Sequence, residues 1–78
     1  MRRMEEKILS ICRKICCREI TDEEELILSG ILDSFKIMEL ICELEGLFGI
    51  TFVPDEIMDM DNFSTVHNMA ELVRQKLH

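Results

Sequence analysis

The sequence predicts an all-α fold: a small four-helix bundle with three main helices, a short third helix and a long loop between helices one and two. Apolar residues recur at three- and four-residue spacing along most of the chain, which is the period of amphipathic helices. The chain has no Trp, no Tyr, one Pro and three Gly, whereas all-β domains usually need more aromatic and turn residues. Its 78 residues suffice for one domain, residues 1–78, with a modest core.

The first helix is expected over residues 2–17. Its apolar stripe is formed by Met4, Ile8, Ile11, Cys12 and Ile15. A long loop should follow, because Thr21 and Glu24 form a possible capping box for one turn at most and Ser29-Gly30 breaks the chain. One apolar residue of this acidic loop is expected to reach the core: Leu26, Ile27 or Leu28.

The second helix, residues 33–48, is the most strongly indicated. Asp33 can accept hydrogen bonds from the free amides of the first turn, and Gly49 suits a C-terminal cap. Its apolar face comprises Ile37, Leu40, Ile41, Leu44, Leu47 and Phe48. We expect Ile41, Leu44 and Phe48 to be core residues.

The last third of the chain should add a short helix and a long one. Residues 50–53 are expected to be an extended loop, after which Pro54 opens the short helix. Ile57, Met58 and Met60 would anchor that helix in the core. After a turn at 61–63, Ser64 or Asp61 would cap a final helix ending at Leu77 and followed by His78. The inner face of that helix would comprise Val66, Met69, Ala70, Val73 and Leu77.

The charge of −7 is unevenly distributed. Residues 1–18 hold six bases and two acids (+4), residues 19–61 one base and thirteen acids (−12), and residues 62–78 two bases and one acid (+1). Such a chain is not expected to bind nucleic acid, which selects basic faces. No apolar run approaches the length of a membrane span.

The cysteines form no CxxC pair, so we expect free thiols in a reducing cytosol. They are Cys12, Cys16, Cys17 and Cys42. No metal site is expected. Cys12 and Cys16 share a helix face but lack a fourth zinc ligand, and the calcium-like start at Asp59 lacks the later ligands.

Ser34 is the residue most suited to carry chemistry. It follows Asp33 at the start of the second helix, where free amides and the helix dipole favour an attached phosphate. Neither His67 nor His78 is placed to activate it as a nucleophile, and so small a chain builds no deep active site. A serine here is better suited to modification than to catalysis. The ordinary alternative is a serine beside an N-cap with no further role.

The motif Asp33-Ser34-Phe35 resembles the D-S-L, D-S-M or D-S-F attachment signature of acyl carrier proteins and of peptidyl or aminoacyl carrier domains. Residues 44–50, Leu-Glu-Gly-Leu-Phe-Gly-Ile, resemble that family's L-E-x-x-F-G-I end of the second helix. Residues 52–56 resemble its short third helix, and residues 62–66 its F-x-T-V entry to the last helix. The resemblance covers roughly residues 5–77 and implies a bundle of the acyl-carrier type.

The resemblance implies a 4'-phosphopantetheine group attached covalently to Ser34. A phosphopantetheinyl transferase would add it, and Asp33 would help that enzyme dock its metal-bound cofactor. The arm would hold an acyl or aminoacyl group as a thioester, while the chain itself catalyses nothing. Further implied partners are an adenylating ligase or acyltransferase and other biosynthetic enzymes. The expected protein is a cytoplasmic monomer that does not insert into the membrane.

The cargo is expected to be aminoacyl, D-alanyl or that of a specialised pathway rather than of fatty-acid synthesis. Residues 30–35, Gly-Ile-Leu-Asp-Ser-Phe, differ from the L-G-x-D-S-L of common fatty-acid carriers. Lys36 also replaces the acidic or small residue that many of those carriers have.

Partner enzymes are expected to dock on the second and third helices. The candidate contact residues are Phe35, Met38, Glu39, Cys42, Glu43, Glu45 and Ile57. Two simpler interpretations stay open: the apolar members only widen the core face, and the acids only form a solvated one. A different function also stays open, an unmodified helical adaptor that binds a partner through Phe35, Met38 and the acidic face.

Overall fold

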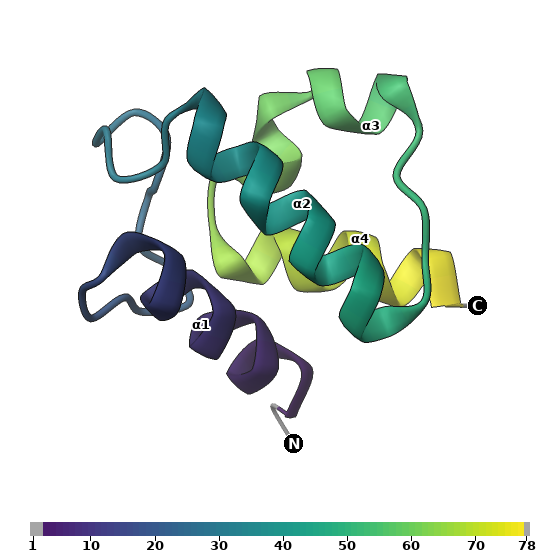
Figure 1. Cartoon of the computed structure of the whole chain (residues 1–78), viewed down its shortest axis with the longest axis horizontal. Helices are drawn as coiled ribbons and strands as arrows, with labels where there is room; N and C mark the ends of the chain where they lie inside the picture. The colour runs from purple at the N-terminus through teal and green to yellow at the C-terminus, as the bar shows by residue number, and fades with distance from the viewer. Residues whose placement is uncertain (1–2, 78) are drawn as a thin grey trace.

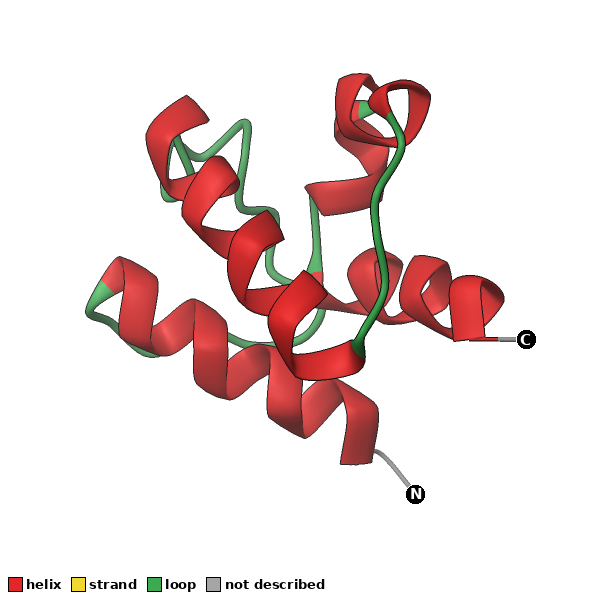
Figure 2. Ribbon diagram, turned by 45° about the vertical axis from the view of Figure 1, so that its right-hand side comes forward, coloured by secondary structure: helices red, strands yellow, loops and turns green. Residues whose placement is uncertain are grey.

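The computed structural model describes residues 3–77, and helices form all of the regular structure in that range (Figures 1 and 2). In chain order these are α1 (Arg3–Cys16), α2 (Ser34–Phe48), α3 (Pro54–Met58), the 3₁₀ helix η1 (Met60–Phe63) and α4 (Val66–Leu77). The expected all-α class is confirmed. Residue 2, where the first helix was expected to begin, and His78 lie outside the described residues.

The helix α1 packs against both α2 and α4, whereas the short α3 contacts η1 (Figures 1 and 2). No described helix is both long and apolar enough to cross a membrane. The helix α1 ends at Cys16, one residue earlier than expected, because Cys17 adopts a left-handed backbone conformation at φ 57°.

The core draws on every α-helix except the short α3, and on the loops. Its fully buried large side chains are Ile8, Cys12, Ile20, Leu26, Leu40, Leu44, Phe63, Val66, Met69 and Val73. Phe52 and Phe63 meet edge to face, with ring centroids 5.6 Å apart. The extended segment 50–53 forms no strand and delivers Phe52 to this core, as expected.

The loop between α1 and α2, residues 17–33, is fastened to the rest of the bundle. Leu26 is fully buried, and its amide donates to the carbonyl of Ser64 at 2.8 Å. The amide of His67 donates to the carbonyl of Asp22 at 2.9 Å. The expected loop is therefore confirmed, and it connects the start of α4 to the segment that leads into α2.

The helix caps expected from the sequence are confirmed for α2, whereas the expected cap of α4 differs from the observed one. Asp33 caps the start of α2, and Gly49 ends it with φ at 67°, both as expected. The cap of α4 is Thr65, whose hydroxyl accepts from the amide of Asn68 at 3.0 Å. The expected cap at Ser64 or Asp61 is wrong: the hydroxyl of Ser64 donates to the carbonyl of Asp61 and closes η1, so the expected turn is a short 3₁₀ helix.

Several residues expected in the core are exposed. Ile41 and Leu44 are buried, whereas Phe48 lies in the last turn of α2 and is only partly covered. Four further residues that were expected in the core are exposed, and they lie at helix ends or on the short α3: Leu47, Met58, Met60 and Leu77. A helix of five residues turns one side inward, and in α3 that side carries Ile57.

Two ion pairs connect distant parts of the chain. The Arg74 guanidinium donates to both carboxylate oxygens of Glu5 at 2.8 and 2.7 Å, joining α4 to α1. Lys76 donates to Glu56 at 2.7 Å and lies 5.5 Å from the centre of the Phe52 ring. The hydrogen bond from Lys76, with one from the backbone amide of Val53, holds the pKa of Glu56 below its ordinary value.

Arg74→Ala should lower the free energy of unfolding by about 3 kcal/mol, because it leaves the Glu5 carboxylate buried without this partner. The value is at the lower end for a buried pair, since Arg74 keeps 37% of its side chain exposed. Urea unfolding measures the loss. Arg18→Ala is the matched control, because its pair with Glu24 is solvent-exposed and should be worth at most about 1 kcal/mol. Equal losses in the two variants would contradict the argument.

Candidate functional site

Ser34 is the first residue of α2 and is exposed. Next to it, the Asp33 carboxylate accepts from the amide of Lys36 at 2.8 Å, and the Asp33 carbonyl accepts from the amide of Ile37 at 2.9 Å. Among residues 3–77, no hydrogen bond engages the Ser34 hydroxyl. The serine is therefore held on a capped helix start while its oxygen stays accessible to an approaching reagent.

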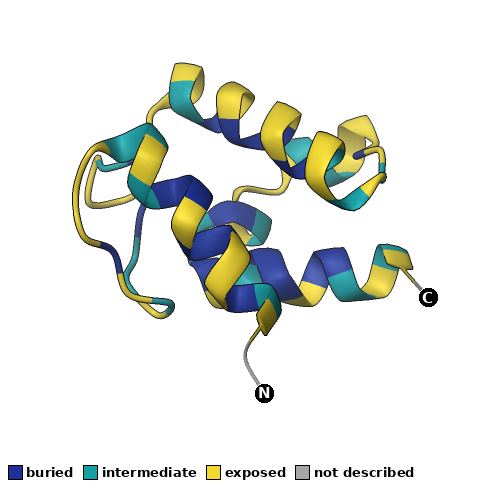
Figure 3. Ribbon diagram, turned by 60° about the horizontal axis from the view of Figure 1, so that its bottom comes forward, coloured by how far each residue is buried: buried dark blue, intermediate teal, exposed yellow. Residues whose placement is uncertain are grey.

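The outer face of α2 begins at Ser34 and carries an open groove. The groove is lined by Phe35, Met38, Glu39, Cys42, Glu43, Gly46 and Leu47. Phe35 is 75% exposed and Met38 56% exposed, so these side chains do not widen the core. Figure 3 shows this face turned away from α1 and α4, with the buried side of α2 toward them. Five of the seven expected contact residues thus share one surface.

The other two expected contact residues, Glu45 and Ile57, lie elsewhere. Glu45 is half-buried, and its carboxylate accepts from the amide of Phe52 at 3.0 Å, which fixes the segment after α2. Ile57 is half-buried against the core. Within the groove, Glu43 pairs with Lys14 of α1 at 3.2 Å, and both side chains remain largely exposed.

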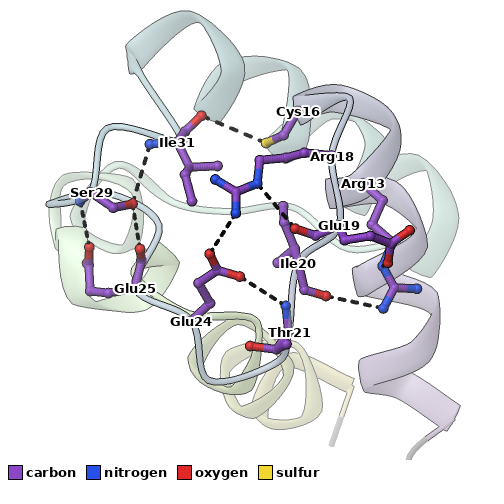
Figure 4. Close-up of polar contacts among 10 residues, drawn as sticks. All are labelled: Arg13, Cys16, Arg18, Glu19, Ile20, Thr21, Glu24, Glu25, Ser29 and Ile31. Carbon is purple, nitrogen blue, oxygen red and sulfur yellow. Dashed lines mark hydrogen bonds and ion pairs between the residues drawn. The ribbon is translucent and has the colours of Figure 1, made fainter.

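The loop that leads into α2 is ordered by side-chain hydrogen bonds (Figure 4). Glu24 accepts from the amide of Thr21 at 3.2 Å and from Arg18 at 3.1 Å. Only this half of the possible capping box forms, because the amide of Glu24 donates to the Thr21 carbonyl instead of its hydroxyl and no helix follows. Glu25 and Ser29 form a second cluster further along. Sequence reasoning missed this second cluster; its only signal was a Glu four residues before a Ser-Gly pair.

The thiols differ in accessibility. Burial raises the pKa of the Cys12 thiol to about 12, so it stays protonated. Partial burial also raises the pKa of Cys16, an effect that nearby Lys36 and Arg18 oppose. Cys17 and Cys42 are exposed. Across the described part of the chain, no three His, Cys, Asp or Glu side chains are grouped so that they could hold a metal ion.

A small helical bundle that offers an exposed serine at the capped start of α2, beside an acidic and apolar helix face, has the layout of a carrier domain. Comparison with known families agrees: the model described as "Phosphopantetheine attachment site" matches residues 6–73. The chain therefore belongs to the phosphopantetheine-attachment family of carrier proteins. Members of this family bear 4'-phosphopantetheine covalently and interact with biosynthetic enzymes.

Similar curated proteins cover nearly the whole chain. The chain is 37% identical to the D-alanyl carrier protein of Lactococcus lactis subsp. cremoris (strain MG1363) over 76 residues, which cover 94% of this chain and 95% of that protein. It is 35% identical to the D-alanyl carrier protein of Streptococcus uberis over 74 residues, 92% of each chain. The D-alanyl carrier protein of Bacillus velezensis is 32% identical over 68 residues, covering 83% of this chain and 86% of that one.

Proposed function

We propose that this protein carries D-alanyl or another aminoacyl group on a 4'-phosphopantetheine arm attached to Ser34. The observation that carries the proposal is the Ser34 hydroxyl, which is exposed, engaged in no hydrogen bond within residues 3–77, and located on the first turn of α2. Membership of the phosphopantetheine-attachment family supports a phosphopantetheine ester at this oxygen. It also favours a carrier over the unmodified adaptor.

The residues around Ser34 fit a phosphodiester chemically. The Ser34 oxygen would form a new P–O bond to the β-phosphorus of coenzyme A while the bridging P–O bond of the pyrophosphate breaks. Adenosine 3',5'-bisphosphate would leave, and the hydroxyl proton would pass to a base of the transferase. The first turn of α2 places a positive dipole end beside the negative phosphate. Asp33 engages only one carboxylate oxygen in the cap, so its charge remains available to a metal ion held by the transferase. The thiol of the attached arm holds the cargo as a thioester.

The names of the relatives support D-alanine as the cargo. An adenylating ligase would activate D-alanine with ATP and pass it to the arm, and a further enzyme would accept it. Phe35, Met38, Glu39, Cys42 and Glu43 form the face these enzymes would contact, with apolar side chains for burial and acids for basic patches. The protein itself would perform no catalysis and would act as a cytoplasmic monomer, without nucleic acid and without insertion into a membrane.

The test is to incubate the protein with coenzyme A and a broad-specificity phosphopantetheinyl transferase and to measure the intact mass. We expect the gain of one phosphopantetheine group, and tandem mass spectrometry of the peptide should place it on Ser34. Adding ATP, D-alanine and a D-alanine-activating ligase should then add one alanyl group that hydroxylamine removes. A protein that gains no phosphopantetheine would be the adaptor. If the protein gains phosphopantetheine but no alanyl group, the proposed carrier role stands and D-alanine is not its cargo.

Substitution of Asp33 should separate its two roles. Asp33→Asn keeps an N-cap acceptor and should unfold within about 0.5 kcal/mol of wild type, whereas Asp33→Ala should cost about 1 kcal/mol. Both variants lack the charge, so both should accept phosphopantetheine at least tenfold more slowly. Urea unfolding and mass-spectrometric time courses supply the two readouts. A normal transfer rate in Asp33→Asn would limit Asp33 to capping.

A further inference from the structure

The most exposed large apolar side chain of the described residues is Leu28, in the loop just before α2. It is 91% exposed, although the loop has already supplied Leu26 and Leu32 to the core, where they are 0% and 3% exposed. An isolated exposed leucine needs no explanation. The backbone that carries Leu28, however, is held in a defined shape, and that combination gives it functional interest.

Hydrogen bonds fix the loop tip on both sides of Leu28. One Glu25 carboxylate oxygen accepts from the amide of Leu28 and, at 3.1 Å, from that of Ser29. The Ser29 hydroxyl donates to the Glu25 carbonyl at 2.6 Å. Gly30, with φ at 83°, donates from its amide to the carbonyl of Ile27 at 3.0 Å. The Glu25–Ser29 cluster is visible in Figure 4.

The base of the loop is fixed as well. The amide of Leu32 donates to the carbonyl of Leu26 at 2.8 Å, and both side chains are buried. Leu28 is therefore presented at the tip of a closed and anchored turn, with its backbone already ordered. Because binding then orders little more than one side chain, an apolar residue presented in this way can contribute most of its burial energy to an interface.

The position of this tip identifies the partner it can meet. Leu28 is two residues from Leu26 and Ser34 is two residues from Leu32, so the tip lies within about 22 Å of Ser34 even with both connections extended. Figure 1 shows the loop bent beside the start of α2. An enzyme that bonds the Ser34 oxygen must cover the surface around it, roughly 800 Å² in an interface of standard size. Enzymes that react at the distant end of the arm can dock on the α2 face without covering the loop that carries Leu28.

The geometry points to Leu28 as an anchor that inserts into an apolar pocket of the phosphopantetheinyl transferase beside its active site. This inference rests on the proposed attachment at Ser34. Phe35, which follows Ser34 in the chain as Leu28 precedes it, would be the second apolar contact. The transferase would then contact exposed apolar side chains both before and after the serine. Glu25 would be a positioning residue, because its carboxylate holds the backbone of Leu28 and touches no substrate.

The test uses the full chain, coenzyme A and a broad-specificity phosphopantetheinyl transferase, with the carrier as the varied substrate. Leu28→Ser should lower kcat/KM for phosphopantetheine transfer about tenfold, mainly through KM. Leu28→Met should stay within about twofold of wild type, because it keeps the apolar bulk. The matched control is Leu77→Ser, the same change on an exposed side chain where α4 ends, on the opposite side of the molecule from the start of α2 (Figure 1). It should transfer at the wild-type rate, and melting curves should show all variants folded.

Variants of Glu25 provide a second test of the inference. Glu25→Ala should slow transfer several-fold, whereas Glu25→Gln keeps an oxygen acceptor for the loop amides and should recover most of the rate. Equal slowing in these two variants would overturn the positioning role. A wild-type rate in Leu28→Ser, or equal slowing in Leu77→Ser, would overturn the anchor and leave the attachment at Ser34 standing. A wild-type protein that gains no phosphopantetheine would overturn both.

Discussion

Ser34→Ala is expected to fold with wild-type stability and to gain no phosphopantetheine at all. The side chain is exposed and forms no hydrogen bond within the described residues, so its removal leaves no polar partner unsatisfied. Alanine is also at least as good a helix former as serine. The change in the free energy of unfolding should therefore stay within about 0.5 kcal/mol. Urea unfolding and intact-mass measurement together give this result.

The matched control is Ser10→Ala, which removes an exposed hydroxyl from α1 and should leave modification unchanged. A Ser34→Ala protein that still gains one phosphopantetheine would place the attachment on another side chain. A Ser34→Ala protein that unfolds would show that the serine supports the structure. The first result would overturn the proposed site, and the second would overturn the expected stability.

Phe63→Ala should produce the largest loss of stability, about 3–5 kcal/mol in the free energy of unfolding. Phe63 is fully buried in η1, and its ring meets that of Phe52 at 69° with centroids 5.6 Å apart. The substitution removes buried apolar area and leaves a cavity between η1 and its neighbours. Because small domains are stable by about 5–15 kcal/mol, the loss should be visible as partial unfolding on mild heating.

The control for this prediction is Phe35→Ala, the same change at a ring that is 75% exposed. It should alter the free energy of unfolding by no more than about 0.5 kcal/mol. Chemical denaturation of the two variants under identical conditions makes the comparison. Similar values for both would show that the site of Phe63 collapses around the deletion and that this ring is not central to the core.

The helices could be predicted from the sequence because their signals are local. Asp33 and Gly49 cap the two ends of α2 through hydrogen bonds to residues three or four positions away. The apolar stripe of α1 recurs at the helical period within the helix itself. How far the core extends along each helix is not local. Phe48 has the right phase but lies where α2 leaves the core, whereas Phe63, in a segment expected only to turn, is fully buried.

The site divides in the same way. Ser34 and Asp33 were found because their motif is contiguous, and the exposed face of α2 follows from the helical period. Glu45 shares the acidity of that face but is used to hold Phe52, a contact that no local pattern announces. Leu28 lay among three candidates for burial, and only the folded loop shows that Leu26 enters the core while Leu28 points outward.

The pair between Glu5 and Arg74 has a consequence for how the chain is made. The partners are separated by 69 residues, so at 5–20 residues per second the ribosome delivers Arg74 roughly 3–14 s after Glu5. Until then, the first helix can pack against α2 but has neither this pair nor its contacts with α4. The pair therefore cannot contribute to folding until synthesis is nearly finished. The last helix to be synthesised completes the packing of the first.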